Sequence, residues 1–288
     1  MTGVLIIDKP AGWTSMDVCA KLRGVFHEKR VGHGGTLDPM ATGVLPVFLG
    51  RATRAVEYAT DSDKEYIAGL RLGLVTNTQD TTGEVLEQRS AAVSPAEVEA
   101  VLSRFTGEQE QIPPMFSAIK KDGKKLYELA RKGVEVERKA RKIVIKELEI
   151  TKRIDETDYE LRVLCSKGTY VRTLCHDIGA ALGCGAAMCS LRRSMAAGYT
   201  LADAAALDDV LNAADPAALL RPVDSCFRRF PAVTIDEKAL FKARNGAAFP
   251  WDAPDGTFRV YGPDGGFLLL AECRDGRMTT VKSFFEVT

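Results

Sequence analysis

The sequence Gly-His-Gly-Gly-Thr-Leu-Asp-Pro at residues 32–39 separates a helix-like pattern from a strand-like one. Three glycines and one proline within eight residues are incompatible with a regular helix or strand, so a shaped loop is predicted. The loop presents one carboxylate, Asp38. A carboxylate in such a loop can act as a nucleophile, a base or a metal ligand. It can equally close the turn by bonding to its own backbone, and the local sequence leaves both interpretations open.

Strand and helix patterns alternate irregularly on both sides of this loop. Strands are predicted at residues 3–8, 41–49, 64–74, 143–154 and 159–166. Helices are predicted from the N-cap Ser15 to about His27, from the capping box at Ser94 to about Phe105, near residues 125–132 and at 170–182. Long strands mixed with scattered helices favour an α+β fold over a strictly alternating parallel one.

The character of the sequence changes near Phe230 and Pro231. After a short helix, three glycine-punctuated β segments follow at 257–262, 266–273 and 278–287. We therefore expect two domains, residues 1–229 and a small β-rich domain at 230–288, with 203–229 as the connector.

Charge is unevenly distributed along the chain. The net charge is zero, but residues 117–153 contain 13 Lys or Arg against 6 Asp or Glu, and the remainder 26 against 33. A basic segment on an acidic body is typical of a phosphate-backbone contact, although a solvated charged surface explains it equally well.

Several site classes lack their sequence signatures. The seven cysteines include no C-x-x-C pair, no second carboxylate lies at chelating spacing from Asp38, and no phosphate-binding or dinucleotide-binding glycine motif occurs. We expect no metal and no cofactor, with covalent or base catalysis at Asp38. The first ten residues resemble no targeting signal or membrane span, so a cytoplasmic protein without a membrane partner is expected.

Six motifs follow one another between residues 3 and 195. They are DKPAGWTS at 8–15, GHGGTLDPMATGVLP at 32–46, KEY at 64–66, QIPPMFSA at 111–118, GTYVRTL at 168–174 and LRR at 191–193. In content and order they resemble the TruB family of tRNA pseudouridine synthases. The segment 230–288 resembles a small PUA-type RNA-binding domain in size, position and β pattern.

The resemblance implies a mixed, mainly antiparallel central sheet with flanking helices, the pseudouridine synthase fold. It also implies isomerisation of the T-loop uridine of tRNA, position 55 in the standard tRNA numbering, to pseudouridine. The flipped-out nucleotide would react in a closed pocket. Asp38 matches the catalytic carboxylate, Tyr66 the tyrosine that stacks on the target base, and Arg172 the arginine that pairs with the aspartate and keeps it ionised.

Four further residues match substrate-binding positions of the family. Tyr170 and Leu191 match pocket residues that contact the uracil, His33 matches a histidine that holds the flipped substrate loop, and Lys9 matches a supporting residue. By themselves, the tyrosines and Leu191 would pass as core residues, and His33 as an ordinary loop residue.

The basic segment corresponds to a family insertion, at about residues 113–142, that folds over the RNA. Its cations are candidates for phosphate contacts, which add affinity without reading sequence. They are Lys120, Lys121, Lys124, Lys125, Arg131, Lys132, Arg138, Lys139, Arg141 and Lys142.

The expected partner is the T-arm of tRNA, with no guide RNA and no obligate protein partner. Two other interpretations remain. One is a non-catalytic protein that grips or folds the T-arm. The other is a relative that acts within a guide-RNA particle, which the short C-terminal segment disfavours.

Overall fold

A large mixed sheet forms the body of the protein in a computed structural model, in which residues 1–285 are described. The strand order is β14-β1-β3-β12-β4-β11-β10-β7, with β2 beside β3 and β13 beside β12. Neighbours are antiparallel except β1–β14 and β3–β12. The strands are β1 (Gly3–Lys9), β2 (Val31–His33), β3 (Thr42–Leu49), β4 (Lys64–Leu72), β7 (Gly107–Gln111), β10 (Arg141–Arg153), β11 (Asp158–Cys165), β12 (Ala186–Ala196), β13 (Tyr199–Thr200) and β14 (Ala205–Ala206).

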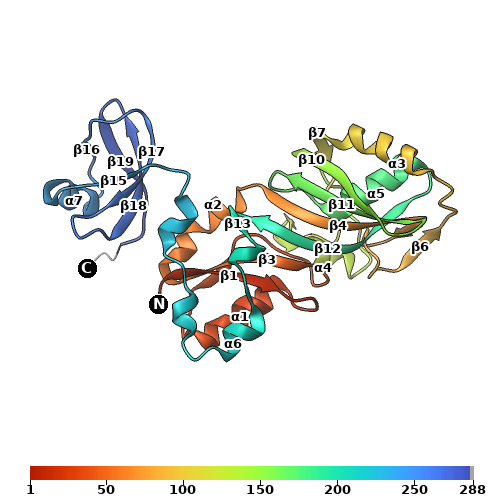
Figure 1. Cartoon of the computed structure of the whole chain (residues 1–288), viewed down its shortest axis with the longest axis horizontal. Helices are drawn as coiled ribbons and strands as arrows, with labels where there is room; N and C mark the ends of the chain where they lie inside the picture. Colours follow the sequence, from red (N-terminus) through yellow and green to blue (C-terminus); the bar gives the residue numbers. More distant parts are fainter. Residues whose placement is uncertain (286–288) are drawn as a thin grey trace.

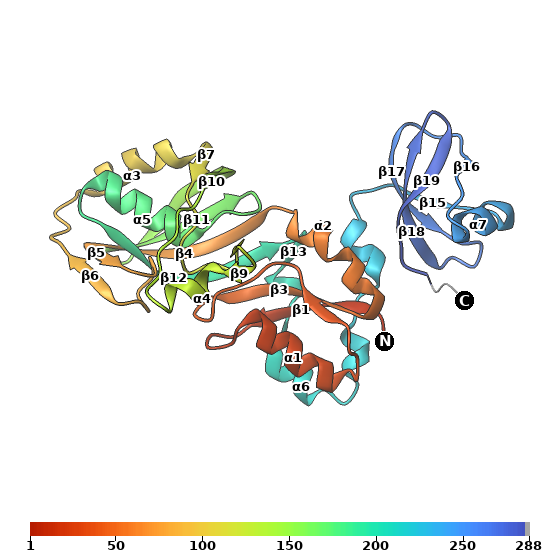
Figure 2. The ribbon, with the colours of Figure 1, turned by 180° about the vertical axis from the view of Figure 1, so that it is seen from behind.

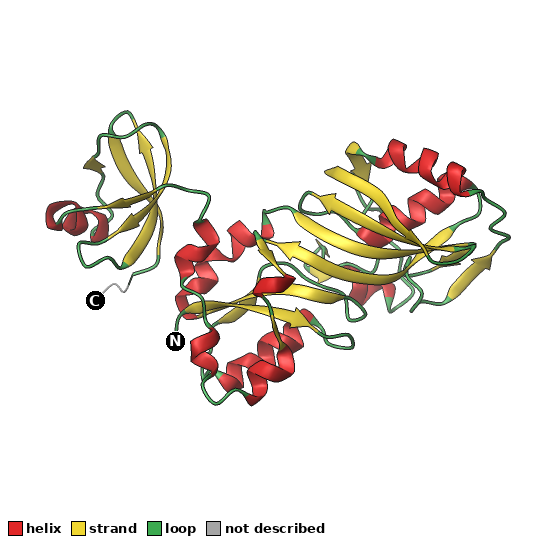
Figure 3. Ribbon diagram, in the orientation of Figure 1, coloured by secondary structure: helices red, strands yellow, loops and turns green. Residues whose placement is uncertain are grey.

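Helices flank this sheet, which confirms the predicted α+β class with a mixed, mainly antiparallel sheet (Figure 3). Seen from behind, α4 and α5 lie on the same side of it (Figure 2). The α-helices are α1 (Ser15–Val25), α2 (Val56–Thr60), α3 (Pro95–Leu102), α4 (Leu126–Ala130), α5 (Val171–Leu182) and α6 (Leu207–Asn212). Short 3₁₀ turns are η1 (Gly50–Ala55), η2 (Ser103–Phe105), η3 (Leu201–Asp203), η4 (Pro216–Leu219) and η5 (Val223–Phe227).

Helix α5 shows why the predicted pattern produces a packed helix. Val171, Leu174 and Ile178 are buried at the spacing of one helical face, and Leu182 is half-buried at the end of the helix. The helix ends at Gly183, whose φ of 79° favours glycine. The buried face packs on β12, so the first turn of α5, which carries Arg172, is fixed against the sheet.

The start of α1 differs from the prediction. Thr14, not Ser15, is the N-cap: its side chain accepts a hydrogen bond from the Asp17 amide, and the Asp17 carboxylate accepts one from the Thr14 amide. Ser15 is the first helical residue, and its side chain is free for another contact. The predicted loop also begins later than expected, because Gly32 and His33 belong to β2.

The central strand β12 was not predicted. It pairs with β4 on one side and with β3 on the other, and so joins the two halves of the sheet. Its second half, Leu-Arg-Arg-Ser-Met-Ala, places two arginines in the middle of a strand. A buried arginine breaks the polar–apolar alternation by which strands are recognised, and Arg193 is only 1% exposed.

A second sheet forms the C-terminal part, with the order β15-β17-β18-β19-β16. Its elements are β15 (Ala232–Thr234), α7 (Glu237–Arg244), β16 (Phe249–Pro250), β17 (Gly256–Tyr261), β18 (Phe267–Arg274) and β19 (Arg277–Ser283). The three predicted β segments are confirmed as β17, β18 and β19, but positions 286–287 of the third lie outside the described residues. This sheet has its own core around Phe249, Val260 and Leu269.

Residues 203–229, predicted as a connector, are packed against the large sheet. Strand β14 pairs with β1, α6 adds Leu207 and Val210 to the main core, and Phe227 of η5 is fully buried. The centre of the Phe227 ring lies 5.5 Å from that of Phe284, which directly follows β19. This contact joins the end of the second sheet to the part of the protein built on the large sheet.

Two small hairpins project from the large sheet. One pairs β5 (Leu74–Thr76) with β6 (Val85–Gln88), and the other pairs β8 (Lys120–Lys121) with β9 (Lys124–Lys125). Across residues 1–285, none of the helices has the length and apolar character required to span a bilayer.

Candidate functional site

A buried arginine fixes the loop that carries Asp38 through hydrogen bonds to backbone carbonyls. Arg193 of β12 donates from Nε to Val44 O at 2.7 Å and from Nη2 to Gly35 O at 3.1 Å. Gly43 allows β3 to approach this arginine: its φ is 102°, and a Cβ there would lie 2.2 Å from Arg193 O. The loop is therefore fixed by contacts that only the folded sheet supplies.

Asp38 and Arg172 form an ion pair at the centre of the site. Arg172 Nε lies 2.9 Å from Asp38 Oδ2, and Nη2 donates to Oδ1 at 3.3 Å. The arginine side chain is 6% exposed, whereas that of Asp38 is 33% exposed. The carboxylate is thus oriented by a buried cation and still reachable from outside.

Arg172 also contacts two other parts of the chain. It donates from Nη2 to Phe116 O at 2.8 Å and from Nη1 to Thr78 O at 3.1 Å, and Nη1 lies 3.7 Å from Asp80 Oδ2. The same guanidinium therefore contacts Asp38, the polar turn after β5 and the root of the basic insertion. A lysine could not reach all of these acceptors at once.

Asp80 is a buried carboxylate that sequence reasoning missed. Its Oδ1 accepts hydrogen bonds from the Thr78 hydroxyl at 2.8 Å and from the amide and hydroxyl of Thr82 at 2.9 and 2.6 Å. Residues 76–83 form a polar turn, and nothing in their sequence indicates that this Asp faces Arg172. Two carboxylates thus share one guanidinium.

The pKa of Asp38 is raised from its ordinary value, with burial as the main cause. Arg172 lowers the pKa of Asp38, Asp80 raises it again, and Lys9 lowers it. The predicted effect of Arg172 therefore has the right sign, but it offsets only part of the desolvation.

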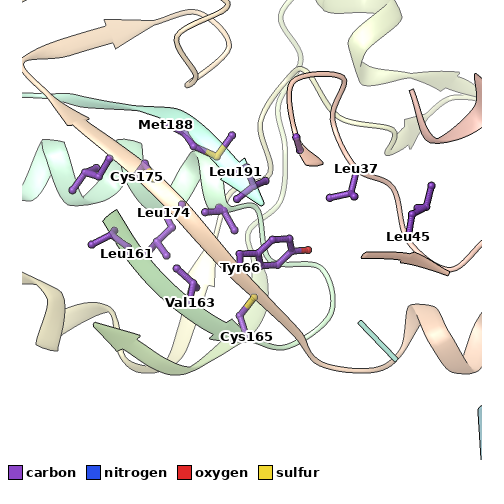
Figure 4. Close-up of a cluster of buried hydrophobic side chains, with 14 of the residues drawn as sticks. Leu37, Leu45, Tyr66, Leu161, Val163, Cys165, Leu174, Cys175, Met188 and Leu191 are labelled. Atoms are coloured by element: carbon purple, nitrogen blue, oxygen red, sulfur yellow. The ribbon is translucent and has the colours of Figure 1, made fainter. Parts of the chain in front are cut away.

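Tyr66 and Leu191 lie on neighbouring strands beside the Asp38 loop. Both are 8% exposed, and Leu191 pairs in register with Ala68 of β4. Figure 4 shows the Tyr66 ring pointing from β4 toward Leu37, with Leu191 next to it. Burial raises the pKa of Tyr66 and outweighs the opposing charge of Arg193, so the phenol is favoured in its neutral form.

Tyr170 is the N-cap residue of α5, two positions before Arg172. The Gln111 side chain donates to Tyr170 O at 3.1 Å and accepts from Tyr170 N at 2.8 Å, which fixes this backbone. Burial raises the pKa of Tyr170, and a hydrogen bond with Ser117 opposes this shift. Its position places Tyr170 directly before the first turn of α5, which carries Arg172.

His33 and Lys9 are placed differently. His33, at the end of β2, is half-buried, and burial followed by Arg193 lowers its pKa; the neutral imidazole is favoured. Lys9 is fully buried and donates to Pro10 O, Trp13 O and Pro39 O at 2.8, 2.7 and 3.4 Å. Burial lowers the pKa of Lys9 to about 8. Lys9 thus supports the loop rather than facing the opening.

The basic insertion extends its cations into solvent. Eight of the ten are exposed, and Lys125 and Arg138 are half-buried. Lys125 and Arg131 both lie 5.4 Å from the centre of the Tyr127 ring. The insertion is tied to the site through Phe116 O, which accepts from Arg172.

Within residues 1–285, no group of three or more His, Cys, Asp or Glu side chains is arranged to hold a metal ion. The site brings together the carboxylates of Asp38 and Asp80, the guanidinium of Arg172, the buried phenol of Tyr66 and the half-buried phenol of Tyr170.

The sequence matches two protein-family models and is similar to known proteins over almost its whole length. Residues 23–171 match the model of the TruB family pseudouridylate synthase N-terminal domain, and residues 172–228 match that of the tRNA pseudouridylate synthase B C-terminal domain. The chain is 40% identical to tRNA pseudouridine synthase B of Clostridium kluyveri, over 99% of this chain and 100% of that protein. It is 43% identical to the protein of the same name from Syntrophomonas wolfei, over 98% and 96%.

A solved structure is similar over almost the whole chain. The structure described as a Cbf5-Nop10-Gar1 complex covers 98% of this chain and 85% of its own, with a TM-score of 0.74 and 27% identity. The likeness includes both sheets.

Proposed function

Because the chain belongs to the TruB family of pseudouridylate synthases, and is thus a tRNA-modifying isomerase, we propose that it converts the T-loop uridine at position 55 of tRNA to pseudouridine, with Asp38 as the nucleophile. The observation that carries this proposal is the Asp38–Arg172 ion pair, which is open on one side. The Tyr66 ring points toward Leu37, the residue before Asp38, with Leu191 next to it (Figure 4).

The isomerisation needs no oxidant and no second substrate, because uridine and pseudouridine have the same atoms. The glycosidic C–N bond breaks, the detached uracil rotates, and a C–C bond forms. One proton leaves the ring carbon and one is gained at the ring nitrogen. Asp38 attacks the flipped nucleotide or assists cleavage of the glycosidic bond. Arg172 orients the carboxylate for this step, and Asp80 orients Arg172.

Tyr66, Tyr170 and Leu191 supply the walls for the base. A uridine flipped toward Asp38 would stack on the Tyr66 ring, with Leu191 beside it. Detached uracil must not escape, so apolar walls and exclusion of water favour rejoining over loss. The Tyr66 hydroxyl, whose neutral form is favoured by burial, is our candidate to relay the proton: it takes the proton from the ring carbon as it passes its own toward the ring nitrogen. His33 would contact the flipped loop in its neutral form.

RNA binding is assigned to two regions. The insertion at about 113–142 carries ten cations and is anchored at Phe116 beside the site, so it would close over the T-arm and contact phosphates. Residues 230–288 would form the second domain, a PUA-like RNA-binding unit joined to the catalytic domain at 1–229. We propose that this protein recognises the T-arm directly, without guide RNA or an obligate protein partner.

The test uses purified protein and an isolated T-arm hairpin carrying tritium at the uracil carbon that forms the new bond. Tritium release by the wild type, followed by mapping of the modified position, is expected. Asp38→Asn should release no tritium but should bind the hairpin with nearly unchanged affinity. Binding by the wild type without any tritium release would favour the non-catalytic T-arm binder. Activity only with an added guide RNA or protein would favour the guide-RNA alternative.

A further inference from the structure

We propose that Ser15 is a positioning residue for the catalytic carboxylate, acting through both backbone groups of Leu37. This inference deepens the proposed function and rests on it, because Leu37 immediately precedes Asp38. Ser15 Oγ accepts a hydrogen bond from Leu37 N at 2.8 Å and donates one to Leu37 O at 3.2 Å. A hydroxyl has one donor and two acceptor sites, so it can make both bonds at once.

Both residues in these two hydrogen bonds are buried, so water cannot replace the serine hydroxyl. Ser15 is 1% exposed and Leu37 is 3% exposed, so neither backbone group of Leu37 can turn to water without moving. Leu37 lies in a loop between β2 and β3 and has no strand partner. The serine thus takes the role that a neighbouring strand takes elsewhere in the sheet.

The other side of Asp38 is held from the same segment. Pro39 O accepts from Gly12 N at 2.8 Å and from Lys9 Nζ at 3.4 Å. Residues 9–15 therefore form hydrogen bonds with the backbone both before and after Asp38. The carboxylate itself is then oriented by Arg172. Backbone and side chain of Asp38 are fixed by separate contacts, and Ser15 is the side chain that satisfies both polar groups on the Leu37 side.

Removal of the hydroxyl should therefore displace Asp38 rather than unfold the protein. Ser15→Ala leaves a buried amide and a buried carbonyl unpaired, and the loop must shift to reach water or another partner. A shift of about 1 Å at a nucleophile can cost on the order of 100-fold in rate. RNA affinity should be unaffected, because Ser15 is not exposed to the substrate.

Thr14 provides a matched control on the same helix. Thr14→Ala removes the N-cap of α1, including the bond from the Asp17 amide, but leaves both Leu37 bonds intact. It should lower thermal stability as Ser15→Ala does, without slowing the reaction. Ser15→Thr keeps the hydroxyl and should restore most of the rate lost in Ser15→Ala.

The experiment compares wild type, Ser15→Ala, Ser15→Thr and Thr14→Ala in single-turnover tritium release, with hairpin affinity and amide exchange of residues 35–41 measured in parallel. Ser15→Ala should be roughly 10- to 100-fold slower at unchanged affinity, with faster exchange at Leu37. A wild-type rate in Ser15→Ala, or an equal rate loss in Thr14→Ala, would overturn the inference.

The same measurements separate this inference from the proposed function. An inactive wild type would defeat the proposed function. The exchange data would then still decide whether Ser15 holds Leu37, since unchanged exchange in Ser15→Ala would overturn that role without any reference to activity.

Discussion

Arg172 and Asp38 are 134 positions apart in the sequence, and in the fold Arg172 Nε lies 2.9 Å from Asp38 Oδ2. The arginine comes from the first turn of a helix and the aspartate from a loop between two strands. This pair explains how a carboxylate can be largely desolvated and still be held ready for reaction. It is also the relationship from which the first two predictions follow.

Substitution of Arg172 by Lys should lower the rate by about 10- to 100-fold, although the charge is kept. The planar guanidinium reaches Asp38, Thr78 O, Phe116 O and the vicinity of Asp80, and an ammonium group cannot replace all of these contacts. Single-turnover rates and hairpin affinity will show the effect. A Lys variant as fast as the wild type would show that charge alone is required.

The pH dependence of the rate should report on Asp38. The reaction needs the ionised carboxylate, and burial raises its pKa, so the rate should begin to fall at a pH above the ordinary aspartate range near 4. Asp80 raises the pKa of Asp38, so Asp80→Asn should move this acid limb to lower pH. Arg172 lowers the same pKa, so Arg172→Gln should move it to higher pH. Single-turnover rates between about pH 5 and 8 test the opposite signs, and equal shifts in both variants would contradict this account.

Tyr66→Phe separates stacking from proton transfer. The phenylalanine ring keeps the apolar wall, so hairpin affinity should change little. Loss of the hydroxyl that relays the proton should slow the reaction by about 100-fold or more. Tyr66→Leu should additionally weaken binding. If the Phe variant reacts at the wild-type rate, Tyr66 contributes only its ring.

Gly43→Ala should destabilise the protein by about 3 kcal/mol, because the position combines a positive φ with a collision against the Arg193 backbone. Gly198→Ala is the control: its φ is 77°, but no atom lies within 4 Å of the added Cβ. The control should lose only about 1 kcal/mol. Urea unfolding of both variants measures the difference, and equal losses would show that the close approach to Arg193 is unimportant.

The basic insertion should set the salt dependence of RNA binding. Lys120 and Lys124 are exposed on its hairpin, and replacing both by Ala should flatten the slope of log affinity against log salt by up to about 0.9 per lost phosphate contact. Lys152→Ala with Arg153→Ala removes the same charge from the far end of β10 and should leave the slope unchanged. Equal slopes in the two double variants would place the RNA elsewhere.

Much of the candidate site could be identified from local sequence and motif order. The glycine-rich loop around Asp38 was evident because glycine and proline leave the backbone few alternatives. Helix α5 followed from its apolar spacing, and the C-terminal strands from their glycine punctuation. These are properties of neighbouring residues, so the sequence is sufficient to predict them.

Three features of the structure could not be predicted from local sequence. Thr14 rather than Ser15 caps α1, and the Ser15 side chain instead bonds to Leu37, which is far away in the sequence. The central strand β12 carries a buried arginine that is stable only because backbone carbonyls from two distant loop positions and β3 surround it. Asp80 became part of the site only when the turn after β5 packed against α5.

Residue identity and short-range spacing were enough to predict the family, the order of most elements and Asp38 as the candidate carboxylate. Tertiary structure decided how Asp38 is held, by Ser15 through Leu37 and by Arg172 and Asp80 across more than forty residues of chain. The physical reason is that desolvation and hydrogen-bond pairing depend on which distant atoms become neighbours, and folding alone establishes that.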